Sequence, residues 1–213
     1  MHQTRALLVV VAAAGLAACS GNPGPQSPGS QARASLPVVQ RPVSQADVHF
    51  MAGMIPHHAQ AVKMAQLAGP NGARSDIRIL AERIAVAQRD EIAMLQAWLR
   101  QRNQPVPDAN ATRHRMNMDG MEHDMLMPGM LTEAEMAQIE QARGEEFDRL
   151  FLTFMIRHHE GAITMVDELF ASYGAAQDED VFRFASDVYA DQTTEIHFMQ
   201  KMLDELLAQA RQR

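Results

Sequence analysis

Two pairs of adjacent histidines, each framed by methionines, are the residues of this chain best suited to metal chemistry. They occur in two copies of one pattern, from Asp47 to Met64 and from Asp148 to Met165. Imidazole nitrogen binds Cu(II), Zn and Ni, whereas thioether sulfur binds soft ions such as Cu(I). The pattern therefore predicts a copper site. The identical pairs of the two copies are Asp47 and Asp148, Phe50 and Phe151, Met54 and Met155, His57 and His158, His58 and His159, Ala61 and Ala162, and Met64 and Met165.

The residues of each copy share one face of a predicted helix. At about 100° per residue, eight residues of the first copy fall within an arc of roughly 140°: Asp47, Phe50, Met51, Met54, His57, His58, Ala61 and Met64. Met54 and His58 are four residues apart, so a thioether stacks beside an imidazole along the helix axis. Pro56 is expected to kink the first helix, and its counterpart Arg157 is not, so the two copies are expected to differ. We predict metal ligands at Met54, His57, His58, Met64, Met155, His158, His159 and Met165.

The duplication continues into a second helix in each half. After a shift of three residues, Gln88, Glu91, Ile92, Leu95 and Leu99 match Gln192, Glu195, Ile196, Met199 and Leu203. The two glutamates are predicted to supply carboxylates to the same interior, and His197 lies close to the second. These three residues join the predicted metal ligands. In a structural alternative, the histidines hydrogen-bond Glu91, Glu195, Asp47 or Asp148 and hold the helices in register.

A segment between the two copies is rich in methionine and histidine and has neither helical nor strand periodicity. Methionines usually fill protein cores. A polar segment bounded by proline and glycine, however, is expected to offer no core to fill. Mixed thioether and imidazole groups favour copper over other metals. The predicted ligands of this segment are His114, Met116, Met118, Met121, His123, Met125, Met127 and Met130.

The N-terminus indicates export. A polar start with Arg5 precedes an apolar stretch, Ala6 to Ala18, that is too short for a stable membrane-spanning helix. Residues 1–18 are therefore predicted to be a signal peptide. Leu16-Ala17-Ala18-Cys19 resembles the lipobox of bacterial lipoproteins, so Cys19 is the predicted lipid anchor. Residues 19–43, rich in Pro, Gly and Ser, are predicted to be a flexible linker that tethers the protein to a membrane of the cell envelope, facing the periplasm or the outer surface.

The remaining chain is expected to form one domain, 44–209, built from two related halves. Repeat one spans 44–102, the Met/His-rich insertion 103–131 and repeat two 132–209. The formal net charge is −7, and no basic cluster is interleaved with aromatic residues, so nucleic acid is excluded as a partner. Cys19 is the only cysteine. Soft-metal chemistry in the domain must therefore use thioether sulfur.

Apolar residues recur at three- and four-residue spacings, which predicts an all-α fold. Each predicted helical hairpin leaves an apolar stripe exposed, so the two hairpins are expected to pack as a four-helix bundle. A short helix should follow the Thr132 and Glu135 capping box. The long helices are expected from about Ser44 to Gly69, from Ser75 as N-cap to Arg102, from Glu145 to Tyr173 and from Asp178 to Gln209.

Both motifs resemble those of a bacterial family catalogued as domain of unknown function 305. The resemblance covers about Ser44 to Leu207. It implies a ferritin-like four-helix bundle in an exported protein. Some members of the family are periplasmic copper-binding proteins that protect cells from copper and bind silver, and most members have no assigned role. The residues that carry it are Met54-Ile55-Pro56-His57-His58 with Ala61 and Met64, and Met155-Ile156-Arg157-His158-His159-Glu160-Gly161-Ala162 with Phe151 and Met165.

Three functions are compatible with the sequence. The first is a lipid-anchored copper-binding protein, not a catalyst, that holds Cu(I), Cu(II) or silver for sequestration, tolerance or transfer. Its partners would be metal ions, the membrane and a copper-handling protein, and its histidine ligands would weaken as the pH falls through about 6 to 7. The second is a structural or interaction lipoprotein with core histidines. The third, a di-metal oxidase, is disfavoured because the chain has no Glu-x-x-His motif.

Overall fold

The structure is a computed structural model that describes residues 43–118 and 121–212, with side chains outside 114–124. The predicted signal peptide, the Cys19 anchor and residues 19–42 of the linker lie outside the described residues. Within the described part of the chain, no helix is long and apolar enough to span a membrane. The elements are α1 (Gln45–Gln66), α2 (Ser75–Gln101), β1 (His114–Met118), β2 (Met121–Met125), α3 (Glu133–Gln141), α4 (Gly144–Ala171) and α5 (Glu179–Arg211).

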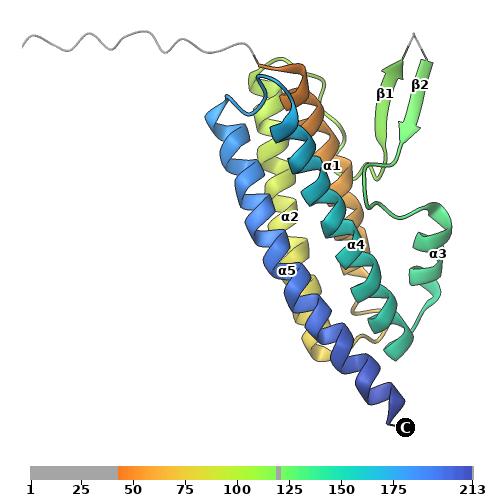
Figure 1. Cartoon of the computed structure of the whole chain (residues 1–213). Coiled ribbons are helices and arrows are strands. Elements are labelled where there is room, and N and C mark those ends of the chain that lie inside the picture. The colour runs from red at the N-terminus through yellow and green to blue at the C-terminus, as the bar shows by residue number, and fades with distance from the viewer. Residues whose placement is uncertain (1–42, 119–120, 213) are drawn as a thin grey trace, which may run out of the picture. The chain divides into compact units, whose positions relative to one another are not determined.

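The fold class is all-α, as predicted, with one small hairpin added. Four long helices, α1, α2, α4 and α5, run side by side, and the short α3 lies against α4 (Figure 1). Helix α1 packs on α2, α4 packs on α5, and α1 also packs on α4. Strands β1 and β2 form an antiparallel pair in which His114 faces Met125 and Met118 faces Met121. The sequence of this segment showed no strand periodicity, so the hairpin was not predicted.

The helix starts follow local hydrogen bonding that the sequence makes visible. Ser44 and Asp47 form a capping box, in which the Asp47 N–H donates to the Ser44 hydroxyl over 2.9 Å. Thr132 and Glu135 form the predicted second box. Ser75 is not an N-cap, because Arg74 occupies that position and makes no side-chain cap hydrogen bond. The Arg74 N–H donates to Asp148 of α4 instead, so a tertiary contact replaces the local cap.

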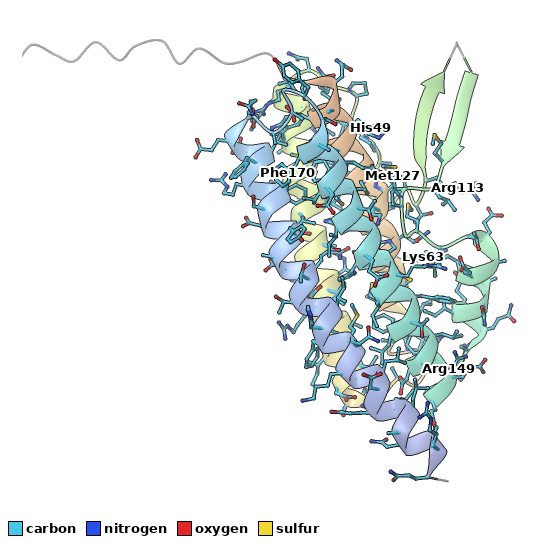
Figure 2. The ribbon with its side chains drawn as sticks, viewed as in Figure 1. His49, Lys63, Arg113, Met127, Arg149 and Phe170 are labelled. Carbon is cyan, nitrogen blue, oxygen red and sulfur yellow. The ribbon has the colours of Figure 1, made fainter. Side chains whose placement is uncertain are left out.

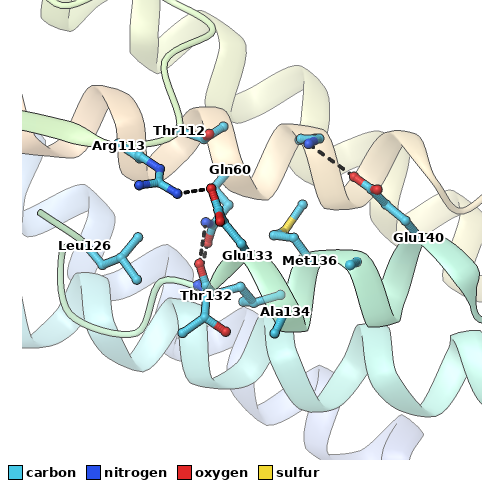
Figure 3. A pocket seen from close by; sticks show the side chains of 12 residues that line it. Gln60, Thr112, Arg113, Leu126, Thr132, Glu133, Ala134, Met136 and Glu140 are labelled. Carbon is cyan, nitrogen blue, oxygen red and sulfur yellow. Dashed lines mark hydrogen bonds and ion pairs between the residues drawn. The ribbon is translucent and has the colours of Figure 1, made fainter. Parts of the chain in front are cut away.

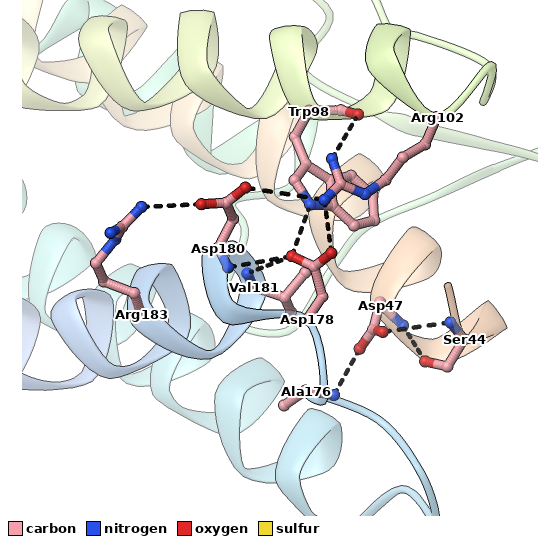
Figure 4. Close-up of polar contacts among 9 residues, drawn as sticks. All are labelled: Ser44, Asp47, Trp98, Arg102, Ala176, Asp178, Asp180, Val181 and Arg183. Atoms are coloured by element: carbon pink, nitrogen blue, oxygen red, sulfur yellow. Dashed lines mark hydrogen bonds and ion pairs between the residues drawn. The ribbon is translucent and has the colours of Figure 1, made fainter. Parts of the chain in front are cut away.

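The duplicated aspartates tie each hairpin to the loop of the other. Asp148, on α4, accepts from the backbone of the loop between α1 and α2. Asp47, on α1, accepts over 2.7 Å from the Ala176 N–H in the loop between α4 and α5 (Figure 4). In the same loop, Asp178 accepts from the Trp98 indole and pairs with Arg102 at 2.5 Å. The aspartates therefore fix the helix ends. Within the described residues they make no hydrogen bond to the four duplicated histidines, contrary to that part of the structural alternative.

Candidate metal centre

The four duplicated histidines meet in the interior, where α1 packs on α4. All four are 0% exposed. The rings of His57 and His158 have centroids 3.8 Å apart and are tilted by 39°. His58 and His159 lie further out, with ring centroids 6.3 and 6.4 Å from those of their neighbours in sequence. Packing of α1 on α4 thus converts two sequence pairs into one buried imidazole cluster.

The outer histidines contact carboxylates from the second helix of each hairpin. His58 Nε2 lies 2.7 Å from Glu91 Oε2 of α2, at ion-pair distance although not aligned as a hydrogen bond. His159 Nε2 donates to Glu195 Oε2 of α5 over 2.7 Å. Both glutamate side chains are 26% exposed. Glu91 and Glu195 therefore lie behind the imidazoles and reach solvent. The hydrogen bond that the structural alternative predicted is present for Glu195, whereas Glu91 lies only at ion-pair distance.

The inner histidines differ from each other. His57 Nε2 lies 3.0 Å from the backbone oxygen of Pro128 in the insertion. A carbonyl oxygen can only accept, so Nε2 of His57 carries the proton and donates it. His158 has no hydrogen-bond partner at either ring nitrogen among the described residues. The Nδ1 atoms of His57, His58 and His159 are likewise buried without a hydrogen-bond partner in the described part of the chain.

Burial keeps the inner rings neutral. Desolvation, aided by the nearby His58, lowers the pKa of His57 to about 3, although the hydrogen bond to Pro128 opposes the shift. Desolvation, followed by repulsion from His57, places the pKa of His158 well below 6.5. A neutral ring that donates from Nε2 has a free lone pair on Nδ1. His57 therefore offers a metal-binding nitrogen to the interior of the protein at any physiological pH.

The duplicated methionines are buried beside these rings along the same helices. Met54, Met64 and Met155 are 0% exposed, and Met165 is 3% exposed. Met54 and Met155 each precede an outer histidine by four residues, which is one turn on the same helix face. The donor set is thus imidazole nitrogen with thioether sulfur, a combination that suits copper and silver. Among the described side chains, no three His, Cys, Asp or Glu residues are arranged to hold a metal ion.

The sequence profile of the family described as a domain of unknown function (DUF305) matches residues 47–203. The chain belongs to the DUF305 family. This confirms the resemblance seen in the histidine and methionine motifs. No protein with a curated description matches the chain.

Solved structures of two DUF305 proteins and of CopM are similar to this chain. A DUF305 protein of Streptomyces coelicolor, described as secreted, is 28% identical, covers 76% of this chain and 93% of its own, and has a TM-score of 0.63. A DUF305 fragment from Deinococcus radiodurans is 27% identical, with coverages of 78% and 99% and a TM-score of 0.63. CopM in its Cu(II)-bound form is 26% identical, with coverages of 75% and 96% and a TM-score of 0.58. CopM is also known in Cu(I)-bound and Ag-bound forms.

The insertion of this DUF305 protein contributes core residues as well as a hairpin. Met127 and Met130 are buried at 8% and 6% exposure, whereas Met125 is 44% exposed. Met127 reaches the long helices (Figure 2), where its methyl group meets Gly53 close to Met165. The prediction that this segment has no core to fill was therefore wrong for Met127 and Met130. The remaining predicted ligands of the insertion, His114, Met116, Met118, Met121 and His123, lie in the two strands, and their side chains are outside the description.

His197 lies apart from the imidazole cluster. It is exposed on α5, and its Nδ1 donates to the Thr193 carbonyl over 2.8 Å, one turn earlier. The duplication gave it no counterpart in the first half: at the shift that matches Glu91 with Glu195, residue 93 is an alanine. The structure therefore brings His197 to the surface and away from the other predicted ligands.

Sequence reasoning missed Gln60 and Pro128, two residues through which α1 and the insertion contact each other. Gln60 bonds to Leu131 and Pro128 to His57, each across 71 residues of sequence, and neither Gln60 nor Pro128 has a side chain typical of a metal ligand. Gln60 also lines a pocket of about 550 Å³ between α1, α3 and the insertion, beside the Lys63–Glu140 and Arg113–Glu133 ion pairs (Figure 3). The available signal was a difference between the copies, since Gln60 corresponds to Gly161.

Proposed function

We propose that this protein binds copper, as Cu(I) and also Cu(II), and silver, through the buried histidines and methionines. The observation that carries the proposal is a set of fully buried imidazoles whose Nδ1 atoms have no hydrogen-bond partner in the described structure. Buried polar atoms are normally hydrogen-bonded, because leaving one unpaired costs about 1–3 kcal/mol. Metal coordination would use these nitrogens.

The oxygens behind the rings support the same proposal. Metal-binding histidines usually donate their other N–H to a carboxylate or a carbonyl, which orients the ring and raises its basicity. His57 donates to Pro128 and His159 to Glu195 in this way, and His58 lies beside Glu91. We therefore assign Glu91 and Glu195 to orienting the ligands, with coordination left to imidazole and thioether groups. Soft Cu(I) and Ag(I) would take the thioethers, and Cu(II) would favour the imidazoles.

The similarity to CopM, known with copper and with silver bound, supports this choice of metal. We propose a binding protein that sequesters copper, gives the cell tolerance to it or transfers it, and that does not catalyse a reaction. We also propose that it is exported, in keeping with the secreted Streptomyces coelicolor relative, and anchored to a membrane of the cell envelope by lipid at Cys19. A copper-handling protein would then be its partner for transfer.

We further infer that the four long helices are a ferritin-like bundle made by duplication of one helical hairpin. The reciprocal contacts of Asp47 and Asp148 with the loop of the opposite hairpin support this origin. So do the matching contacts of His58 with Glu91 and of His159 with Glu195. In a duplicated unit, the two copies of each ligand lie on opposite sides of a pseudo-twofold axis. One motif can build a shared centre in this way.

A structural role for the histidines is the second candidate. It is favoured by the contacts of His58 and His159 with glutamates and by the burial of Met127 and Met130. In this case the protein would be an interaction lipoprotein without a metal.

Anaerobic titration of the protein with Cu(I) against a chromophoric chelator separates these functions. The double variant His57→Gln with His158→Gln should lose stoichiometry, and the exposed His197→Gln should retain it. A second variant, with the insertion methionines changed to Leu, measures how much of the bound copper depends on the insertion. If the unaltered protein fails to compete with the chelator, copper binding is refuted and the structural role stands.

A further inference from the structure

One segment of the insertion packs directly on the imidazole cluster. We call residues 127–131 the strap. The Pro128 carbonyl accepts from His57. Three residues further along both segments, Gln60 of α1 bonds to Leu131 at the end of the strap. Its Nε2 donates to the Leu131 carbonyl over 3.0 Å, and its Oε1 accepts from the Leu131 N–H over 2.6 Å. Both hydrogen bonds are buried. The strap is therefore hydrogen-bonded to α1 at two places, His57 and Gln60.

The duplicated helices differ where they receive the strap. Gln60 corresponds to Gly161, and Gly53 corresponds to Phe154. A Cβ atom at Gly161 would clash with the Pro128 carbonyl group, and one at Gly53 would lie 2.7 Å from the Met127 methyl carbon. A larger residue at either position would push the strap away from the helices.

The strap itself also depends on a glycine. Gly129 has φ +75°, which side chains with a Cβ rarely adopt, and a Cβ there would lie 2.5 Å from the Arg157 carbonyl oxygen. The close approach therefore needs glycine on both surfaces, Gly129 on the strap and Gly161 on α4. Seven ligand and core positions are identical between the copies, whereas these contact positions have diverged.

The approach of the strap makes the two inner histidines chemically different. Because the Pro128 carbonyl can only accept, it holds the proton of His57 on Nε2 and leaves the lone pair on Nδ1. His158, at the equivalent place in the second copy, has no such partner within the described residues. In the metal-free protein, His57 thus has a fixed tautomer and His158 does not.

We propose that Gly161 and Gln60 are positioning residues, which seat the strap so that Pro128 holds His57 in the Nε2–H tautomer with Nδ1 ready for a metal ion. The tautomer is a property of the metal-free protein. Its consequence for metal affinity rests on the proposed copper binding.

The test is the tautomer of His57, read from long-range ¹H–¹⁵N correlation spectra of the imidazoles in the metal-free full chain. The wild-type spectrum should show His57 as the Nε2–H form. Gly161→Ala should displace the strap and give a mixture of tautomers at His57, while His159 keeps its proton on Nε2. Gly69→Ala is the matched control, because nothing lies within 4 Å of a Cβ at that position.

Gln60→Ala provides a second route to the same result, because it removes both hydrogen bonds to Leu131 without introducing a clash. It decides the question if Gly161→Ala fails to fold by circular dichroism. In both variants the dissociation constant for Cu(I) should rise about 10- to 100-fold, the usual effect of losing a partner behind a metal ligand.

The inference is overturned if wild-type His57 carries its proton on Nδ1. It is also overturned if His57 keeps the Nε2–H tautomer in both strap variants with unchanged copper affinity. Failure of the proposed function looks different, because the wild type would then show the expected tautomer and no copper binding.

Discussion

Acidification of the metal-free protein should destabilise the fold through its buried imidazoles. Burial lowers the pKa of His57 from about 6.5 in the unfolded chain to about 3 in the folded one. Between these values the unfolded state binds a proton that the folded state does not. The free energy of unfolding is therefore highest above about pH 6.5 as far as His57 is concerned. It falls as the pH drops, and the fall is complete only near pH 3, where the folded protein also binds the proton.

The expected loss follows from these two pKa values. From about pH 7 to about pH 5, protonation of one unfolded histidine costs about 2 kcal/mol of folding free energy, because each pKa unit corresponds to roughly 1.4 kcal/mol. His158 shifts in the same direction and adds to the loss. Hydrogen bonding with Arg157 lowers the pKa of Glu135 to about 2, so that carboxyl titrates below this range. A total stability of about 5–15 kcal/mol makes the change measurable.

Urea unfolding followed by circular dichroism, with a chelator present, measures the free energy of unfolding at each pH. His57→Gln should remove about 2 kcal/mol of the pH dependence, whatever its effect on stability at pH 7, and the exposed His197→Gln is the control. The reasoning fails if the wild type loses less than about 0.5 kcal/mol between these pH values. It fails equally if His57→Gln retains the full loss, since the protonated ring would then be tolerated inside the fold.

Three further outcomes are expected. Proton competition at His57 and His158 should change copper affinity, measured by chelator competition, less than about twofold between pH 7 and 5, because burial lowers the pKa of both rings. A histidine ligand with a pKa of about 6.5 would lose about 25-fold over the same range. A loss of that size traced to either inner ring would contradict a neutral buried ligand. In urea unfolding, Met127→Ala should lower the free energy of unfolding by about 2–5 kcal/mol, because Met127 is buried. Met125→Ala, at an exposed position, should lower it by less than about 0.5 kcal/mol. Equal effects would refute the core role of Met127. Asp47→Ala should lower the free energy of unfolding in urea by about 1–3 kcal/mol, because it leaves the buried Ala176 N–H without its acceptor. A smaller loss would show that the loop between α4 and α5 does not depend on this hydrogen bond.

The helical part of the fold was predictable because its signals are local. Apolar spacing of three and four residues marks the long helices. The Ser44–Asp47 and Thr132–Glu135 capping boxes mark the starts of α1 and of the short α3. The start of α2 was not predictable in the same way, because Ser75 is not its N-cap. The Arg74 N–H at this helix start donates instead to Asp148, which lies 74 residues away in the sequence.

The insertion was the least predictable part, because its structure depends on what it packs against. Its methionines have no periodicity, so the sequence could not separate Met127, which is buried, from Met125, which is exposed. The close contact of Gly129 with Gly161 left only one trace in the sequence, the difference between Gln60 and Gly161 in otherwise matching motifs.

The sequence by itself determined which donor groups the centre contains and that they occur twice, because residue type and helical spacing place His57 and His58 with methionines on one buried face. Tertiary packing decided how these groups are used. The close, tilted contact of His57 with His158, the low pKa of both rings and the pairing of His159 with Glu195 all arise from contacts between helices. Desolvation and hydrogen-bond partners depend on neighbours that are distant in sequence, and only the fold brings those neighbours within reach.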